Sequence, residues 1–131
     1  MTDIYKMVCD FNNKFGLPQT KGPGWPEDEM VRLKLRHMEE ELNEVRASYI
    51  NGDLEGYFDG LIDLIYVALG AAYFSNLDFN EGFRRVHEAN MTKVRAEKAS
   101  DSKRGSTYDI VKPTGWVAPT LDDLVTRKEK E

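Results

Sequence analysis

The feature that most constrains the fold is a long apolar segment at residues 57–74, with the sequence YFDGLIDLIYVALGAAYF. A bilayer span needs about 20 apolar residues, and aspartates at its centre are costly. Asp59 and Asp63 are the only charged residues in this segment, and no Lys or Arg flanks it closely. We therefore predict a helix buried in a soluble helical bundle and no membrane span.

Apolar residues that recur every three or four positions predict three further helices around this one. The first is expected from residue 2 or 3 to about residue 14. The second is expected from Pro26, which can open a helix, to about Ile50, where the turn-forming sequence NGD follows. The apolar segment predicts the third helix at about 53–75, and a fourth is expected at about 79–98.

The rest of the chain reads as loop and tail. The Gly- and Pro-rich stretch GLPQTKGPGWPEDE predicts a loop between the first two helices. From residue 99 the chain holds turn formers and scattered apolar residues, with a short helix expected after Pro119. The predicted fold class is all-α, a four-helix bundle with an irregular C-terminal tail.

Length, charge and cysteine usage limit the possible functions. A chain of 131 residues can bury its own core, and we predict a single domain over 1–131, with a helical core at about 2–98 and a tail at about 99–131. The net charge of −5 argues against nucleic acid or an acidic membrane as a partner. The lone Cys9 excludes an internal disulfide, and no signal-peptide pattern is seen, so a cytoplasmic location is expected.

Carboxylates are concentrated on the second predicted helix, in the sequence EEELNE at residues 39–44. Glu41 and Glu44 project to the same side of a helix, as do Glu40 and Glu44. Glu41 also lies at the border of the apolar stripe. Taken alone, this pattern fits a solvated acidic face with arginines as partners.

The third predicted helix favours a metal site instead. Asp59 and Asp63 lie one turn apart on a helix that is otherwise apolar, and buried aspartates need a cation as partner. That cation is either Lys or Arg from elsewhere or a metal. Two facing helices, one with E-x-x-E and one with D-x-x-x-D, supply the oxygen ligands that Mg²⁺ takes.

The fourth predicted helix adds the sequence VHEANMTK. Asn90 falls within the apolar stripe, where it can be a buried amide that links helices or a hydrogen-bonding group beside a metal or a phosphate. Lys93, one turn further, is a candidate phosphate contact.

These motifs resemble the all-α nucleotide pyrophosphohydrolases, which include MazG, the phosphoribosyl-ATP pyrophosphohydrolases and the dimeric dUTPases. The resemblance is carried by EELNE at residues 40–44 and by DGLIDLIYVALGAA, with Asp63 at the family aspartate. RHMEEELNEV, VHEANMTK and KPTGWVAP are similar to small, often virus-encoded members. The family pattern E-x-x-D would place an acid at residue 60, where this chain has Gly60, and Asp59 is the available carboxylate.

The resemblance implies cleavage of a nucleoside triphosphate between its α and β phosphates, with Mg²⁺, or Mn²⁺ in its place, neutralising phosphate charge. It implies Glu41, Glu44 and Asp63 as metal ligands and Asp59 as a ligand that binds directly or through a water. Glu40 becomes the proton acceptor. The residues expected to contact substrate are Lys93, which stabilises phosphate oxygens, with Asn90, Arg95, Lys98, Lys112 and Trp116.

The predicted function is a metal-dependent (d)NTP pyrophosphohydrolase that controls the nucleotide pool, with dGTP or dATP preferred. Base stacking is expected from Trp25, Tyr66 or Trp116. The resemblance also implies a homodimer or homotetramer.

Two alternatives remain open, a phosphoribosyl-ATP pyrophosphohydrolase and a non-catalytic helical oligomeric adaptor. A di-iron carboxylate bundle needs Glu-x-x-His, but Lys34 and Arg84 stand three residues before the two histidines.

Overall fold

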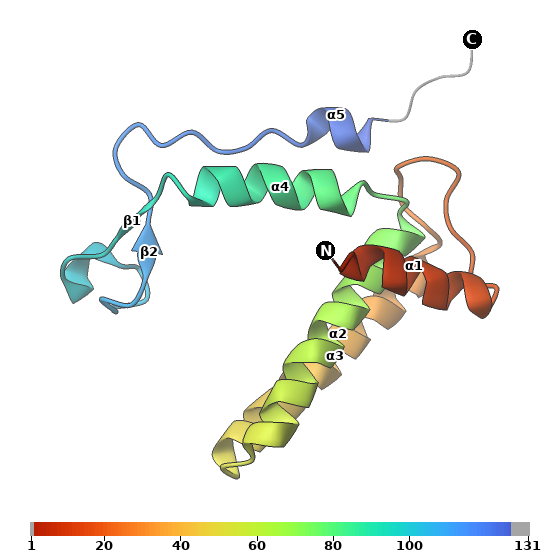
Figure 1. Cartoon of the computed structure of the whole chain (residues 1–131), viewed down its shortest axis with the longest axis horizontal. Coiled ribbons are helices and arrows are strands. Elements are labelled where there is room, and N and C mark those ends of the chain that lie inside the picture. Colours follow the sequence, from red (N-terminus) through yellow and green to blue (C-terminus); the bar gives the residue numbers. More distant parts are fainter. Residues whose placement is uncertain (1, 127–131) are drawn as a thin grey trace. The chain divides into compact units, whose positions relative to one another are not determined.

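The structure is a computed structural model that describes residues 2–126, and it is mainly helical (Figure 1). The elements in chain order are α1 (Ile4–Lys14), α2 (Asp28–Ile50), α3 (Leu54–Phe74), α4 (Phe79–Asn90), β1 (Val94–Arg95), a 3-10 turn (Ala99–Asp101), β2 (Ile110–Val111) and α5 (Asp122–Val125). The predicted all-α class is confirmed, with a two-stranded sheet as a small addition.

The chain forms two compact units. The first contains residues 2–79 together with residues 124–126, and the second is Asn80–Asp123. The prediction of one functional domain over the whole chain stays a prediction.

In the first unit, α1 packs against α3 through its apolar face. Val8 and Asn12 are buried, and the Phe11 ring meets the Tyr66 ring edge-on at 5.3 Å between centroids. The Tyr73 hydroxyl lies within hydrogen-bond distance of two acceptors, the Asn13 Oδ1 atom at 2.9 Å and the Leu17 carbonyl at 3.0 Å. These hydrogen bonds hold the loop that follows α1 against the C-terminal end of α3.

Helices α2 and α3 form a hairpin and pack closely at Gly60. A Cβ atom added to Gly60 would lie 2.8 Å from Val45 Cγ2 and 3.6 Å from the Val45 Cα. Both residues are buried. The missing side chain at Gly60 therefore lets the two backbones approach beside the acidic residues of α2.

The hairpin turn is fixed by a helix cap. Asp53 precedes α3 in an extended conformation, and its carboxylate accepts a hydrogen bond from the Gly56 backbone N–H at 2.9 Å. An Asp at this position satisfies one of the free N–H groups at the start of a helix.

Replacing Asp53 with alanine is expected to lower the free energy of unfolding by about 1 kcal/mol, because the cap is lost. Urea denaturation of the purified protein measures the change. Asp53→Ser is the matched control, since serine also caps and should retain most of the stability. An equal loss in both variants would contradict a capping role.

Only the C-terminal half of α3 is buried as predicted. Val67, Leu69 and Phe74 are buried, but Phe58 is 64% exposed and Ile62 is 47% exposed. On α2, the predicted apolar stripe is also largely open, with Leu35 57% and Tyr49 76% exposed. Within the first unit, α1 covers only one end of the hairpin.

The length and composition of α3 would also permit a membrane span, and these two properties alone do not distinguish such a span from a core helix.

In the second unit, α4 ends at Asn90 and not near residue 98 as predicted. The N–H groups of Met91, Thr92 and Lys93 turn back onto the carbonyls at the end of α4. The chain then enters β1, which pairs antiparallel with β2 in the register Val94↔Val111. The predicted tail is therefore partly ordered, and a short helix after Pro119 is present as α5.

Candidate active site

Three carboxylates from the two hairpin helices form an acidic cluster, which consists of Glu41, Glu44 and Asp63. The Glu41 side chain is only 13% exposed, and its Oε1 atom lies 3.3 Å from His37 Nε2. Its second oxygen, Oε2, is buried and has no hydrogen-bond partner among the described residues. Glu44 follows one turn later on α2, and Asp63 approaches from α3. The cluster predicted from the sequence is thus built around a buried carboxylate.

The electrostatics of the acidic cluster favour a cation. Burial raises the pKa of Glu41, and the nearby negative charges of Glu44 and Asp63 raise this pKa further. His37 acts in the opposite direction. A positive ion placed here would relieve the repulsion and give Oε2 a partner.

The residues present fit a hard divalent ion. Carboxylate oxygens are the ligands that Mg²⁺ takes, and an orphaned buried oxygen is the group such an ion satisfies. Within residues 2–126, no three His, Cys, Asp or Glu side chains are already arranged to hold a metal. Side-chain rotation of Glu44 or Asp63 is therefore needed to complete a coordination shell.

Glu40 and Asp59 lie outside the buried part of the cluster. Both side chains are exposed. Glu40 shares a side of α2 with Glu44, one turn away. The contact between Gly60 and Val45 leaves little room for an acid at residue 60. The predicted roles of Glu40 and Asp59 stay predictions.

In the second unit, the strand register brings two predicted phosphate contacts together. Lys93 precedes β1 and Lys112 follows β2, so the pairing places them side by side. The Nζ atom of each lies 5.1 Å from the centroid of the Trp116 ring. Trp116 Nε1 donates a hydrogen bond to the Ala89 carbonyl at 3.0 Å. Trp116 thus attaches its segment to α4, and its ring also contacts the ammonium groups of Lys93 and Lys112.

Other predicted substrate residues lie elsewhere in the second unit. Asn90 is exposed at the end of α4, so its predicted place within a buried apolar stripe is wrong, because the helix stops there. Arg95 is already engaged: its guanidinium lies 5.3 Å from the Tyr108 ring centroid, and its Nε donates to the Thr107 carbonyl. Lys98 is exposed at the start of the 3-10 turn.

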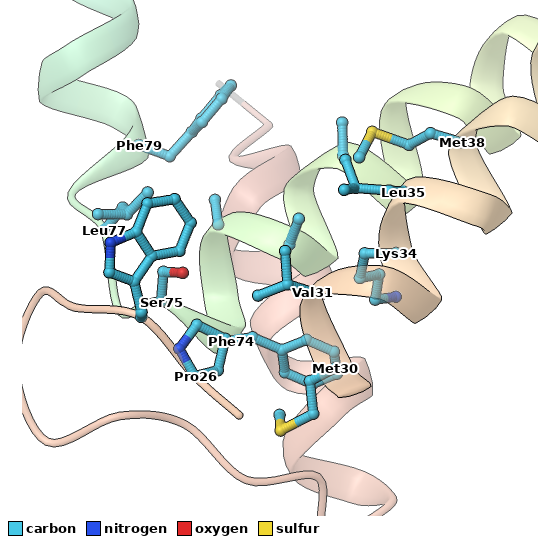
Figure 2. Close-up of a pocket in the computed structure, with 14 residues that line it drawn as sticks. Pro26, Met30, Val31, Lys34, Leu35, Met38, Phe74, Ser75, Leu77 and Phe79 are labelled. Atoms are coloured by element: carbon cyan, nitrogen blue, oxygen red, sulfur yellow. The ribbon is translucent and has the colours of Figure 1, made fainter. Parts of the chain in front are cut away.

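Sequence reasoning did not single out His37 or Lys34 for a functional role. His37 stands four residues before Glu41, and this spacing, which brings two side chains together on a helix, indicates a contact between them. Lys34 interrupts the apolar stripe of α2 and lines a pocket of about 390 Å³ between α2 and the end of α3 (Figure 2). We call this the Lys34 pocket. It is lined by Trp25, Val31, Lys34, Leu35, Met38 and Phe74, among others.

Comparison with known proteins gives one family. The family model described as phosphoribosyl-ATP pyrophosphohydrolase matches residues 8–90, which is more than half of the chain. The match includes α2 and α3 and therefore the whole acidic cluster. No curated protein matches the chain.

Proposed function

The chain belongs to the phosphoribosyl-ATP pyrophosphohydrolase family, within the MazG-like all-α NTP pyrophosphohydrolases, and we propose that it is a metal-dependent nucleoside triphosphate pyrophosphohydrolase. The observation that carries the proposal is the buried Glu41 carboxylate, unpartnered at Oε2 and crowded by Glu44 and Asp63. A cation would relieve this crowding of negative charge around the buried oxygen.

The proposed chemistry follows from the groups in the acidic cluster. Glu41, Glu44 and Asp63 would hold Mg²⁺, with Asp59 as a further ligand, and Mn²⁺ can take the same oxygens. When bound, the ion supplies neutralisation of phosphate charge. Glu40 would accept the proton of the attacking water. The water oxygen bonds to the α-phosphorus while the bond from that phosphorus to the α,β-bridging oxygen breaks, which yields a monophosphate and pyrophosphate.

Phosphate binding is proposed for the lysines beside Trp116. Lys93 and Lys112 are cations next to the paired strands, and paired ammonium groups of this kind stabilise the charge on phosphate oxygens. Asn90, at the end of α4, is a further proposed contact.

We also propose that the chain works as a homodimer or homotetramer. Large apolar side chains remain exposed on the α2–α3 hairpin, including Ile50 at 79% and Phe58 at 64%. Large apolar side chains left exposed in such number favour burial by association with another copy. Light scattering coupled to size-exclusion chromatography measures the mass in solution, and a strictly monomeric protein would contradict this part of the proposal.

The test of the function is chromatographic analysis of the products formed from each NTP and dNTP, and from phosphoribosyl-ATP, in the presence of Mg²⁺. We expect a nucleoside monophosphate and pyrophosphate, with dGTP or dATP turned over faster than phosphoribosyl-ATP. Release of orthophosphate and a diphosphate would place the cleavage at another bond. No turnover of any substrate, together with no effect of Mg²⁺ on thermal stability, would favour the adaptor alternative.

A further inference from the structure

Lys34 is the charged residue among the side chains that line its pocket, which are otherwise apolar apart from Ser75 (Figure 2). Its Nζ atom lies 5.2 Å from the centroid of the Phe74 ring. A Cβ atom at Gly70 of α3 would lie only 2.8 Å from this Nζ. The glycine one turn before Phe74 therefore provides the space that the ammonium group occupies.

The Lys34 ammonium has no polar partner in the described part of the chain. The Lys34 residue is half-buried, and this burial lowers its pKa. Within residues 2–126, the electrostatic contact of this ammonium is with the face of the Phe74 ring, which is not an oxygen acceptor for its three N–H groups. A half-buried donor that lacks an acceptor is suited to bind one from a ligand.

The Lys34 pocket lies beside the acidic cluster along α2. Lys34 and Glu41 are seven residues apart, which places them on one face of the helix at about 10 Å along its axis. Met38 stands between them and lines the pocket. When the phosphates of a nucleotide contact the acidic cluster, its nucleoside is long enough to span this distance and reach the pocket. Trp25, which is 86% exposed, offers an aromatic surface at the rim.

We propose that the Lys34 pocket binds the base of the triphosphate and that Lys34 selects bases with a carbonyl oxygen, such as guanine, over bases with an amino group, such as adenine. This inference rests on the proposed function, because it assigns the base end of the same substrate. Guanine presents two acceptors, O6 and N7, on one edge, whereas adenine presents an amino donor next to N7. An ammonium pairs with the first edge and repels the amino group of the second.

The experiment compares kcat/KM for dGTP and dATP in the native enzyme, Lys34→Met and Lys34→Arg. Methionine keeps the apolar stem without the charge, and arginine keeps the charge. Lys14→Met is the matched control, because Lys14 also lies over a ring, that of Phe15 at 5.5 Å, but does not line the pocket. The pair dUTP and dCTP tests the same rule, since uracil carries a carbonyl where cytosine carries an amino group.

We expect Lys34→Met to lower the preference for dGTP over dATP roughly tenfold or more, which is the effect of one hydrogen bond to a charged group. Lys34→Arg should retain most of the preference, and Lys14→Met should not change it. Equal losses for both substrates in Lys34→Met, or no change, would overturn the inference while leaving the proposed function intact.

Binding measurements separate the two proposals. Calorimetric titration with dGMP and dAMP requires no turnover, so it reports on the pocket even if the chain hydrolyses no triphosphate. Tighter binding of dGMP that is lost in Lys34→Met supports the inference. Equal binding of the two monophosphates, or binding of neither, overturns it.

Discussion

Replacing Glu41 with glutamine is expected to lower turnover of the preferred triphosphate by at least roughly a hundredfold, because even groups that only support metal ligands contribute 10–100-fold. The same change should abolish the rise in melting temperature caused by Mg²⁺ or Mn²⁺. An ion at a hundred times its Kd stabilises a folded protein by about 2.7 kcal/mol, which a thermal melt resolves easily.

Without metal, Glu41→Gln should melt at a higher temperature than the native protein. The sign follows from the raised pKa of Glu41. A carboxyl whose folded-state pKa lies above its unfolded value contributes stability only at low pH, and this contribution is lost as the pH rises through the folded value. Wherever Glu41 is ionised its charge therefore opposes folding, and the neutral glutamine removes that cost.

The matched control is Glu39→Gln, which removes an equal charge from an exposed position two residues earlier on α2. It should leave turnover, the metal-induced shift and the metal-free melting temperature nearly unchanged. If Glu41→Gln kept full turnover, or if both variants lost the metal response equally, the assignment of Glu41 as a ligand would be wrong.

Local signals explain why the helices of the first unit could be predicted closely. Asp3 and Asp53 both cap helices through their side chains, and such residues mark a helix start in any fold. The end of α4 carries no comparable signal, because the residues after Asn90 still favour a helix. The pairing of Val94 with Val111 decides the conformation there, and no local pattern reveals so distant a partner.

The acidic cluster was predictable for a similar reason. Helical spacing alone brings Glu41 and Glu44 to one side, and an aspartate on an apolar helix must lie near a charge of opposite sign or an ion. The environment of Lys34 was not predictable, since a lysine in an apolar stripe can also extend to solvent. Its position depends on the absence of a side chain at Gly70 on the other helix.

The second large effect is expected at Gly60, where the family pattern would place an acid. Replacing Gly60 with glutamate restores that pattern, yet we expect the variant to lose several kcal/mol of stability and most of its folded population at 37 °C. A Cβ atom would lie 2.8 Å from Val45 Cγ2, and overpacking of this kind costs about 1–3 kcal/mol. Glutamate also adds a charge beside three carboxylates without a cation to offset it.

Gly60→Ala separates the cost of overpacking against Val45 from the cost of the added negative charge. Alanine regains about 1 kcal/mol of helix propensity, so overpacking should leave only a small net loss in urea denaturation. Val45→Ala should relieve the contact, and the double variant should then be more stable than the sum of the single changes predicts, by about 0.5–3 kcal/mol.

Asp59→Glu, at the exposed neighbouring position, should stay within about 0.5 kcal/mol of the native protein. A folded Gly60→Glu variant with higher turnover would mean that the α2–α3 contact yields readily and that an acid at residue 60 can join the metal ligands.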